Sequence, residues 1–369
     1  MSSIDINKLL ESINQIITRR DNVNKLIVKK PKSKNDITDI LVSDKIQIPS
    51  LTYPLDKTKV QNWLNEVNKC PNKELLPVAK KILEVTKHVS FNEFLIELKK
   101  CVTQFETHIG NNSYVMLVPG DIYSYSKKSN YWISKMVYHL LKHKPDRVVL
   151  FNDEIDIAEY GNGESLKHIL LCDDGVYSGN QMADHVNKII MNPFMQVIHG
   201  HKIDYSKMKI QIHIVCPYVS DIGSEYIMKI SDSNNRPIKL AQNDVIIHTN
   251  QNTKIFMTPL RLKLSEHEFK LAKVIASSFI NKNACPIYFD HKLPDQFSSL
   301  PKIYGWGYAA CDEYNQNPIK MGSLIENCTA VADIAKEGCP YPPYKAENVN
   351  YVKILDKNQF IEYTNKTKY

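Results

Sequence analysis

Two adjacent aspartates at the end of an apolar run are the residues of this sequence best suited to chemistry. In "HILLCDDGVYSGNQM" (168–182), Asp173 and Asp174 follow the apolar residues and precede a glycine-rich turn. Carboxylates accept hydrogen bonds from vicinal hydroxyls and bind divalent cations. The turn over 175–179 enters a predicted helix, whose first backbone N–H groups, together with the Ser178 hydroxyl, suit a phosphate. The pattern therefore predicts a site for a sugar phosphate.

The apolar runs around this motif predict the strands of a sheet. Runs that are apolar throughout, rather than alternating, are typical of strands buried on both faces. The runs lie at 114–119, 147–152, 168–173, 209–216 and 244–249. Helical segments are expected between and after them at 129–143, 179–190, 222–230 and 265–281. This alternation predicts an α/β fold, a largely parallel sheet flanked by helices, with ligands at the carboxyl ends of the strands.

The first 110 residues predict an α-helical N-terminal region. In "SFNEFLIELKKCVTQF" (90–105), apolar residues recur at three- and four-residue steps, and Ser90 with Glu93 forms a capping-box pattern. Two further helices are expected over 59–70 and 74–89. The predicted organisation is a helical region over 1–110, an α/β domain over 111–345 and a C-terminal tail over 346–369.

The aspartate motif resembles the signature of the type I phosphoribosyltransferases, which bind phosphoribosyl pyrophosphate. That signature is a hydrophobic strand, two acidic residues, two usually apolar residues, a Thr/Ser pair and a glycine. By this resemblance Asp173 and Asp174 are the candidate catalytic residues, which face the ribose hydroxyls and hold Mg²⁺ through ligand hydroxyls or water. The residues expected to contact the ligand and wrap its 5-phosphate are Gly175, Val176, Tyr177, Ser178, Gly179, Asn180 and Gln181.

The sequence departs from that signature inside the loop. Gly175 stands in the place of the usual aliphatic residue, and Tyr177 in that of a small hydroxyl residue. Asn180 and Gln181 replace the usual Gly-Thr. The backbone donors of the loop are kept through these changes.

Two further loops are expected to lie beside the same ligand. After the run at 114–119 come Gly120 and the basic pair Lys127 and Lys128, where the family binds pyrophosphate. The segment at 153–164, where the family has a mobile and commonly basic loop, contains acidic residues and no Lys or Arg. Such a loop should repel a pyrophosphate leaving group unless Mg²⁺ intervenes, which argues against ordinary transferase activity.

A wider likeness covers about residues 60–345. The helical front with "WLNEVNKC", the aspartate loop, "IVCPYVSDIG", "YFDHKLPDQFSSLPKIYGWG" and "CPYPPYK" resemble the divergent phosphoribosyltransferase-like proteins associated with conflict systems. In such a pocket the segment after the last strand often supplies part of a hood over the base or acceptor. The second-rank site candidates are therefore Asp290, His291, Lys292 and Asp295.

Each feature also has an explanation without a ligand. Acidic residues such as Asp173 and Asp174 stabilise the start of a following helix. Lys127 and Lys128 are equally compatible with a solvated pair, and Asp295 after a proline with a turn. Three functions therefore remain open: a Mg²⁺-dependent phosphoribosyltransferase, a sensor that binds phosphoribosyl pyrophosphate or a nucleotide without turnover, and a protein-interaction module on an inherited fold.

Composition narrows the class of protein. The chain has 369 residues, 43% hydrophobic, and its net charge of +7 is too diffuse to indicate nucleic acid as the primary partner. The sequence predicts no membrane span and no secretory signal, so a cytoplasmic protein with mostly reduced cysteines is expected. It contains no C-x-x-C, G-x-S-x-G, phosphate-loop or H-E-x-x-H motif. The oligomeric state is not predicted.

Overall fold

The computed structural model describes residues 36–43, 45–49, 57–120, 129–151, 168–191, 210–231, 244–250, 257–276, 285–290 and 351–367. The chain divides into two compact units, Met1–Asp36 and Ile37–Tyr369, and every helix and strand below belongs to the second. Within these ranges, no helix combines the length and the apolar character that crossing a membrane requires.

The centre of this unit is a five-stranded sheet in which all strands are parallel. In their order across the sheet, the strands are β4 (Arg147–Phe151), β3 (Val115–Pro119), β5 (His168–Cys172), β7 (Gln211–Val215) and β9 (Val245–His248). The five predicted strands are confirmed to within two residues at each end. From β3 the chain moves outward to β4, then returns to β5 on the other side of β3, so the strand order reverses between β3 and β5. In open parallel sheets ligands bind beside such a reversal.

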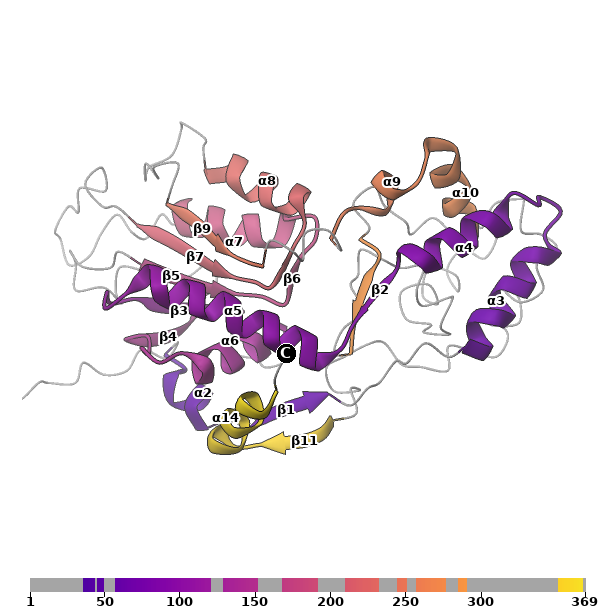
Figure 1. Cartoon of the computed structure of the whole chain (residues 1–369). Helices are drawn as coiled ribbons and strands as arrows, with labels where there is room; N and C mark the ends of the chain where they lie inside the picture. The colour runs from indigo at the N-terminus through magenta and orange to yellow at the C-terminus, as the bar shows by residue number, and fades with distance from the viewer. Residues whose placement is uncertain are drawn as a thin grey trace, which may run out of the picture. The chain divides into compact units, whose positions relative to one another are not determined.

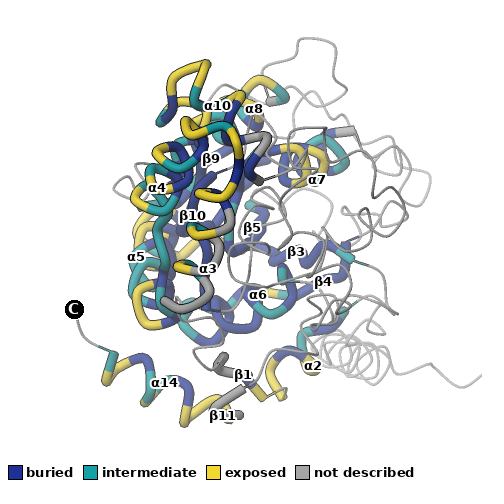
Figure 2. Tube along the Cα trace, turned by 90° about the vertical axis from the view of Figure 1, so that its right-hand side faces the viewer, coloured by how far each residue is buried: buried dark blue, intermediate teal, exposed yellow. Residues whose placement is uncertain are grey.

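Helices cover both faces of the sheet (Figure 1). One face packs against α5 (Phe91–Ile109) and α6 (Ser129–Leu140), and the other against α7 (Asn180–Met191) and α8 (Asp221–Ser231). Successive residues of a strand point to opposite faces, so each strand feeds both cores. Met116 of β3 lies in the core with α5, whereas Leu117 lies in the core with α7. This two-sided burial, dark blue in Figure 2, explains the uninterrupted apolar runs of the sequence.

The helix α5 belongs to the predicted N-terminal region and forms one wall of the sheet core. Its capping box is confirmed: the Ser90 hydroxyl accepts a hydrogen bond from the Glu93 N–H, and the Glu93 carboxylate accepts one from the Ser90 N–H. Its buried side includes Phe94 and Phe105. The helical region before residue 110 thus includes an integral part of the α/β unit.

Four more helices build a separate small core. They are α3 (Lys57–Lys69), α4 (Leu75–Val85), α9 (Leu260–Lys263) and α10 (Glu266–Ala276). Lys81 of α4 lies 2.8 Å from the carboxylate of Glu268 on α10. This pair joins two helices that are far apart in the sequence.

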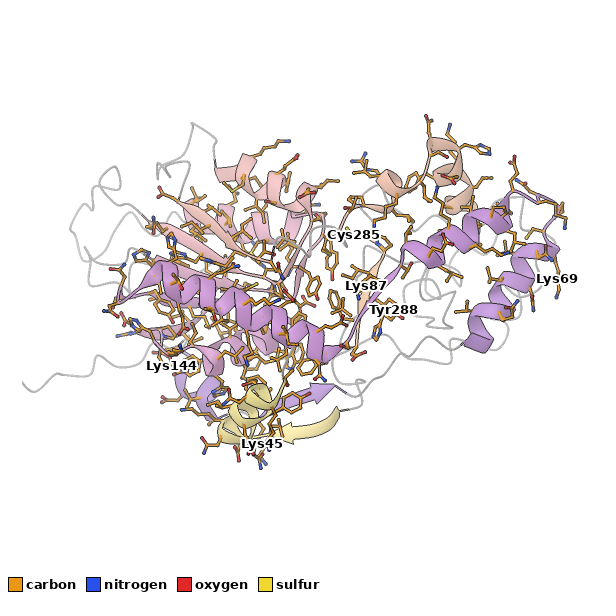
Figure 3. The ribbon with its side chains drawn as sticks, in the orientation of Figure 1. Lys45, Lys69, Lys87, Lys144, Cys285 and Tyr288 are labelled. Carbon is orange, nitrogen blue, oxygen red and sulfur yellow. The ribbon has the colours of Figure 1, made fainter. Side chains whose placement is uncertain are left out.

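The predicted helix over 74–89 is wrong at its end. The helix α4 stops at Val85, and Lys87–Val89 forms β2, which pairs in parallel with β10 (Ile287–Phe289). The Lys87 N–H donates to the Pro286 carbonyl at 2.8 Å, and Figure 3 shows Lys87 and Tyr288 on these neighbouring strands. The partner strand lies about two hundred residues away, so local periodicity could not reveal the change from helix to strand.

The C-terminal residues also pack on the α/β unit. The strand β11 (Tyr351–Leu355) pairs antiparallel with β1 (Ile46–Pro49), which follows α2 (Thr38–Ser43). After β11 comes α14 (Lys357–Lys366), whose Phe360 is buried in the core that contains α5 and α6. The predicted tail therefore contains a strand and a helix.

Cysteines in the described ranges fall into two groups. Cys101, Cys172, Cys216 and Cys285 are free and buried, as expected of small core residues. Cys70 differs, because it is disulfide-bonded. Four of the five cysteines in the described ranges are thus reduced, and Cys70 is the exception.

Candidate functional site

The two aspartates lie where the strand order reverses. Asp173 and Asp174 directly follow β5, and the Asp173 N–H still donates to the Val215 carbonyl of β7 at 3.2 Å. Their side chains are 5% and 0% exposed. Asp173 Oδ1 accepts a hydrogen bond from the Asp174 N–H at 2.9 Å. The carboxylates are therefore held inside the carboxyl edge of the sheet.

Asn130, on α6, connects the end of β5 to α7. Its side chain is 1% exposed; Nδ2 donates to the Cys172 carbonyl at 3.1 Å, and Oδ1 accepts from Gln181 Nε2 at 3.3 Å. It thereby links the end of β5 to the first turn of α7. Asn130 was not predicted as a site residue, since its only signal in the sequence is an amide side chain at the start of the helix after the first strand of the sheet.

The loops after β5 and β7 pack against each other as a short parallel pair. The strand β6 (Gly175–Val176) pairs with β8 (Tyr218–Val219), and Ser220 donates from its N–H to the Val176 carbonyl at 2.9 Å. Gly179 has a φ of 82°, and a Cβ there would lie 2.6 Å from the Gly223 carbonyl oxygen. Gly179 is therefore required by the close approach of the first turn of α8, independently of any ligand.

Two of the departures from the family signature occupy one volume. A Cβ on Gly175 would lie 2.7 Å from Tyr177 Oη, so the tyrosine ring covers the glycine. Tyr177 is 8% exposed, and its Oη has no hydrogen-bond partner among the residues that the structure describes. Burial, and next the charge of Asp174, raises the pKa of the Tyr177 hydroxyl well above its usual range.

The side chains of Val176 and Tyr177 both belong to hydrophobic cores. A contact from either residue to a ligand would therefore use the backbone rather than the side chain. Ser178 is partly exposed, and Asn180 and Gln181 are exposed at the start of α7.

The first turns of α7 and α8 differ in charge. On α8 the Ser220 hydroxyl accepts from the Gly223 N–H at 2.8 Å, and Asp221 lies in the first turn. The first turn of α7 contains no acidic residue, and the Ser178 hydroxyl accepts from the Asn180 N–H at 3.4 Å. Because a helix N-terminus carries partial positive charge, the start of α7 is the better suited of the two to an external anion.

Only some of the other predicted site residues lie within the described ranges. Gly120 directly follows β3 at the same edge of the sheet, with a φ of 152°, and its N–H donates to the Phe151 carbonyl at 3.0 Å. Lys127, Lys128, His291, Lys292, Asp295 and the acidic segment 153–164 lie outside the described residues.

Asp290 has contacts of its own. It is 3% exposed; Oδ2 accepts from the Phe91 N–H at 2.8 Å, and Oδ1 lies 2.7 Å from His88 Nε2. The carboxylate thus stabilises the beginning of α5, and the His88 ring also stacks on Tyr288. These contacts give Asp290 a structural role in the described part of the chain.

Magnesium fits this edge only together with a ligand. Within the described ranges, no cluster of three or more His, Cys, Asp or Glu side chains is arranged to hold a metal ion. Asp173 and Asp174 offer the oxygen ligands that Mg²⁺ prefers, yet two residues cannot complete its octahedral coordination. Ligand oxygens and water would have to supply the remaining positions.

A row of histidines crosses the sheet on the face covered by α5. His213 Nε2 lies 3.2 Å from His168 Nδ1, and His213 Nδ1 lies 3.1 Å from His248 Nε2. Burial, followed by the neighbouring histidines, lowers the pKa of His213 to about 3, and burial lowers that of His248 to about 4. This row was not predicted from the sequence, because its members come from three different strands.

Comparison of the chain with protein-family models, with curated proteins and with solved structures finds no match.

Proposed function

We propose that this chain is a divergent type I phosphoribosyltransferase-like protein that binds a ligand containing ribose 5-phosphate, either phosphoribosyl pyrophosphate or a nucleotide. The observation that carries the proposal is the position of Asp173 and Asp174. They follow β5 at the reversal of strand order, beside a helix whose first turn contains no acid.

The aspartates are assigned to the ribose. A carboxylate repels a phosphate but accepts hydrogen bonds from hydroxyl groups, and it does so more strongly inside the protein than in water. Asp173 and Asp174 are both buried, so a hydroxyl donor that reaches them forms a charge-assisted bond shielded from water. Adjacent carboxylates match the adjacent 2- and 3-hydroxyls of a ribose.

The start of α7 is assigned to the 5-phosphate. Backbone N–H groups in the first turn of a helix lack partners within the helix, and the helix dipole favours an anion there. The neighbouring α8 serves as an internal comparison, because Ser220 and Asp221 already occupy its N-terminus. This contrast supports α7 as the phosphate-binding helix.

In this proposal Mg²⁺ neutralises the negative charge of a pyrophosphate group. The loop from Asp173 to Gln181 contains no Lys or Arg. When bound, Mg²⁺ would neutralise part of that charge, with Asp173 and Asp174 holding it through water or ligand oxygens. The segment 153–164 contains five carboxylates and no Lys or Arg, which disfavours release of pyrophosphate. We therefore propose ligand binding, as in a sensor, rather than turnover.

A comparison of two sugar phosphates tests the ligand class. Ribose 5-phosphate and 2-deoxyribose 5-phosphate are titrated calorimetrically into the protein with Mg²⁺ present, with inorganic phosphate as a control. The ribose compound should bind saturably, and the deoxy compound about tenfold or more weakly, because one carboxylate contact is lost. Equal affinities would contradict the assignment of the aspartates to ribose, and absence of binding by the folded protein would contradict the proposed function.

A further inference from the structure

We propose that Asn130 is a positioning residue that fixes the two halves of this site relative to each other. One half is the pair Asp173 and Asp174, and the other is the start of α7. The effect on a ligand rests on the function proposed above, whereas the effect on the loop stands on hydrogen bonds within the protein.

The sheet opens at the place where Asn130 binds. The strand β3 pairs with β4 along its whole length, Val115–Pro119, but with β5 only at Val115 and Met116, opposite Ile169 and Leu170. The last residues of β5, Leu171 and Cys172, lie beyond that ladder while they remain paired with β7. The aspartates therefore follow a part of β5 that pairs with a strand on one side only.

The carbonyl of Cys172 is directed to the open side. Neighbouring residues of a strand direct their backbone groups to opposite sides, and the Asp173 N–H binds Val215 on β7. The Cys172 carbonyl consequently points toward β3, where the ladder has ended, and it accepts its hydrogen bond from Asn130 Nδ2. The side chain of Asn130 thus replaces a missing strand contact one residue before Asp173.

The second bond of Asn130 extends this restraint to α7. Its Oδ1 accepts from Gln181 Nε2 in the first turn of that helix. An amide is the neutral side chain that donates and accepts at two fixed atoms, so a single buried residue can hold both groups. Aspartate at this position would keep the acceptor for Gln181 but place a negative oxygen against the Cys172 carbonyl.

The position of Asn130 on α6 restrains its own movement. It is the second residue of α6, which packs on β3 and β5, and its side chain is 1% exposed. A change in the start of α6 would therefore move both the aspartates and the phosphate-binding turn. This arrangement makes Asn130 a determinant of selectivity for ribose, without contact with the ligand.

Hydrogen exchange followed by mass spectrometry tests the role of Asn130 in the ligand-free protein. The variants are Asn130→Ala and Asn130→Asp, with Ile133→Ala as a control that loses packing on the same helix. Gln181→Ala, at an exposed position, removes one end of the link without a buried defect. Amides within 173–181 should exchange about tenfold faster in both Asn130 variants than in the control, and to a smaller extent in Gln181→Ala. Unchanged exchange there, relative to Ile133→Ala, would overturn the proposal.

Sugar-phosphate selectivity tests the effect of Asn130 on the ligand. The affinity ratio of ribose 5-phosphate to 2-deoxyribose 5-phosphate should fall from about tenfold toward one in Asn130→Ala, because the carboxylates are no longer held in place. A general loss of stability, as in Ile133→Ala, leaves this ratio unchanged. A ratio that persists in Asn130→Ala would overturn the role in selectivity. If the wild type binds neither sugar phosphate, the proposed function fails, and the exchange result still decides whether Asn130 fixes the loop.

Discussion

Gly175 and Tyr177 share one volume, because a Cβ built on the glycine would lie 2.7 Å from Tyr177 Oη and 2.8 Å from its Cζ. In the phosphoribosyltransferase signature, an aliphatic residue stands at the first position and a small hydroxyl residue at the second. Here the sizes are exchanged. Gly175 and Tyr177 therefore compensate for each other in size within this loop.

This compensation predicts coupled stabilities. Gly175→Ala should destabilise the protein by about 1–3 kcal/mol, because the buried tyrosine ring must move. In the Tyr177→Ser background, Gly175→Ala should cost little stability, because the ring is absent. In the Tyr177→Phe background, which keeps the ring, it should retain most of its cost. Urea unfolding of the single and double variants measures the coupling. If Gly175→Ala costs as much stability in the Tyr177→Ser background as in the wild type, the two side chains do not compete for space.

Gly179 should tolerate a side chain less well than Gly110 does. Both have a positive φ, but a Cβ on Gly179 would meet the Gly223 carbonyl oxygen at 2.6 Å, whereas one on Gly110 has no atom within 4 Å. Gly110→Ala should cost about 1–2 kcal/mol from backbone strain alone. Gly179→Ala should cost about 1–3 kcal/mol more, because the loop after β5 and the first turn of α8 must separate. Denaturant unfolding compares the two variants, and equal losses of stability would contradict the close approach of Gly179 to the start of α8.

The buried histidine row predicts loss of stability in acid. The pKa values of His213 and His248 are lowered to about 3 and about 4 in the fold, mainly by burial, from an unfolded value of about 6.5. The unfolded chain therefore binds more protons between these values. The contribution of the two neutral histidines to the free energy of unfolding is complete above about pH 6.5. It is lost progressively as the pH falls toward the folded pKa values. From pH 7 to pH 5 the loss should be about 2 kcal/mol for each histidine.

Urea unfolding at a series of pH values measures this slope. The variant His213→Leu removes one titrating group and should flatten the dependence between pH 7 and pH 5, whatever its stability at neutral pH. Leu262→Gln, at an exposed position on α9, is the control and should leave the slope unchanged, because neither side chain titrates in this range. A slope in His213→Leu equal to that of the wild type would show that His213 does not titrate with unfolding.

The sheet was predictable from the sequence, because both of its faces are covered. Continuous apolar runs such as that of β5 identify strands buried on two sides, and helices between them require parallel pairing. The capping box of Ser90 and Glu93 was also predictable, since the two residues lie only three positions apart in the sequence. The position of Asp173 at the carboxyl edge followed from the same alternation.

Contacts between distant segments were not predictable. The strand β2 forms because Lys87–Val89 meets Ile287–Phe289, and a periodicity confined to 74–89 favours a helix there instead. Asn130 gains its role from the early end of the ladder between β3 and β5, which depends on strand register. The burial of the Tyr177 ring over Gly175 was not predicted either.

Calorimetric titration of phosphoribosyl pyrophosphate with Mg²⁺ tests the central claim most directly. The proteins are the wild type, Asp173→Asn/Asp174→Asn, and the control Asp184→Asn, which removes a carboxylate from the surface of α7, where it pairs with Lys188 at 3.0 Å. The wild type and the control should bind saturably with equal affinity, and the double variant about a hundredfold more weakly or not at all, because it loses both buried carboxylates. Equal binding by the double variant, or no binding by the folded wild type, would contradict a phosphoribosyl site at these aspartates.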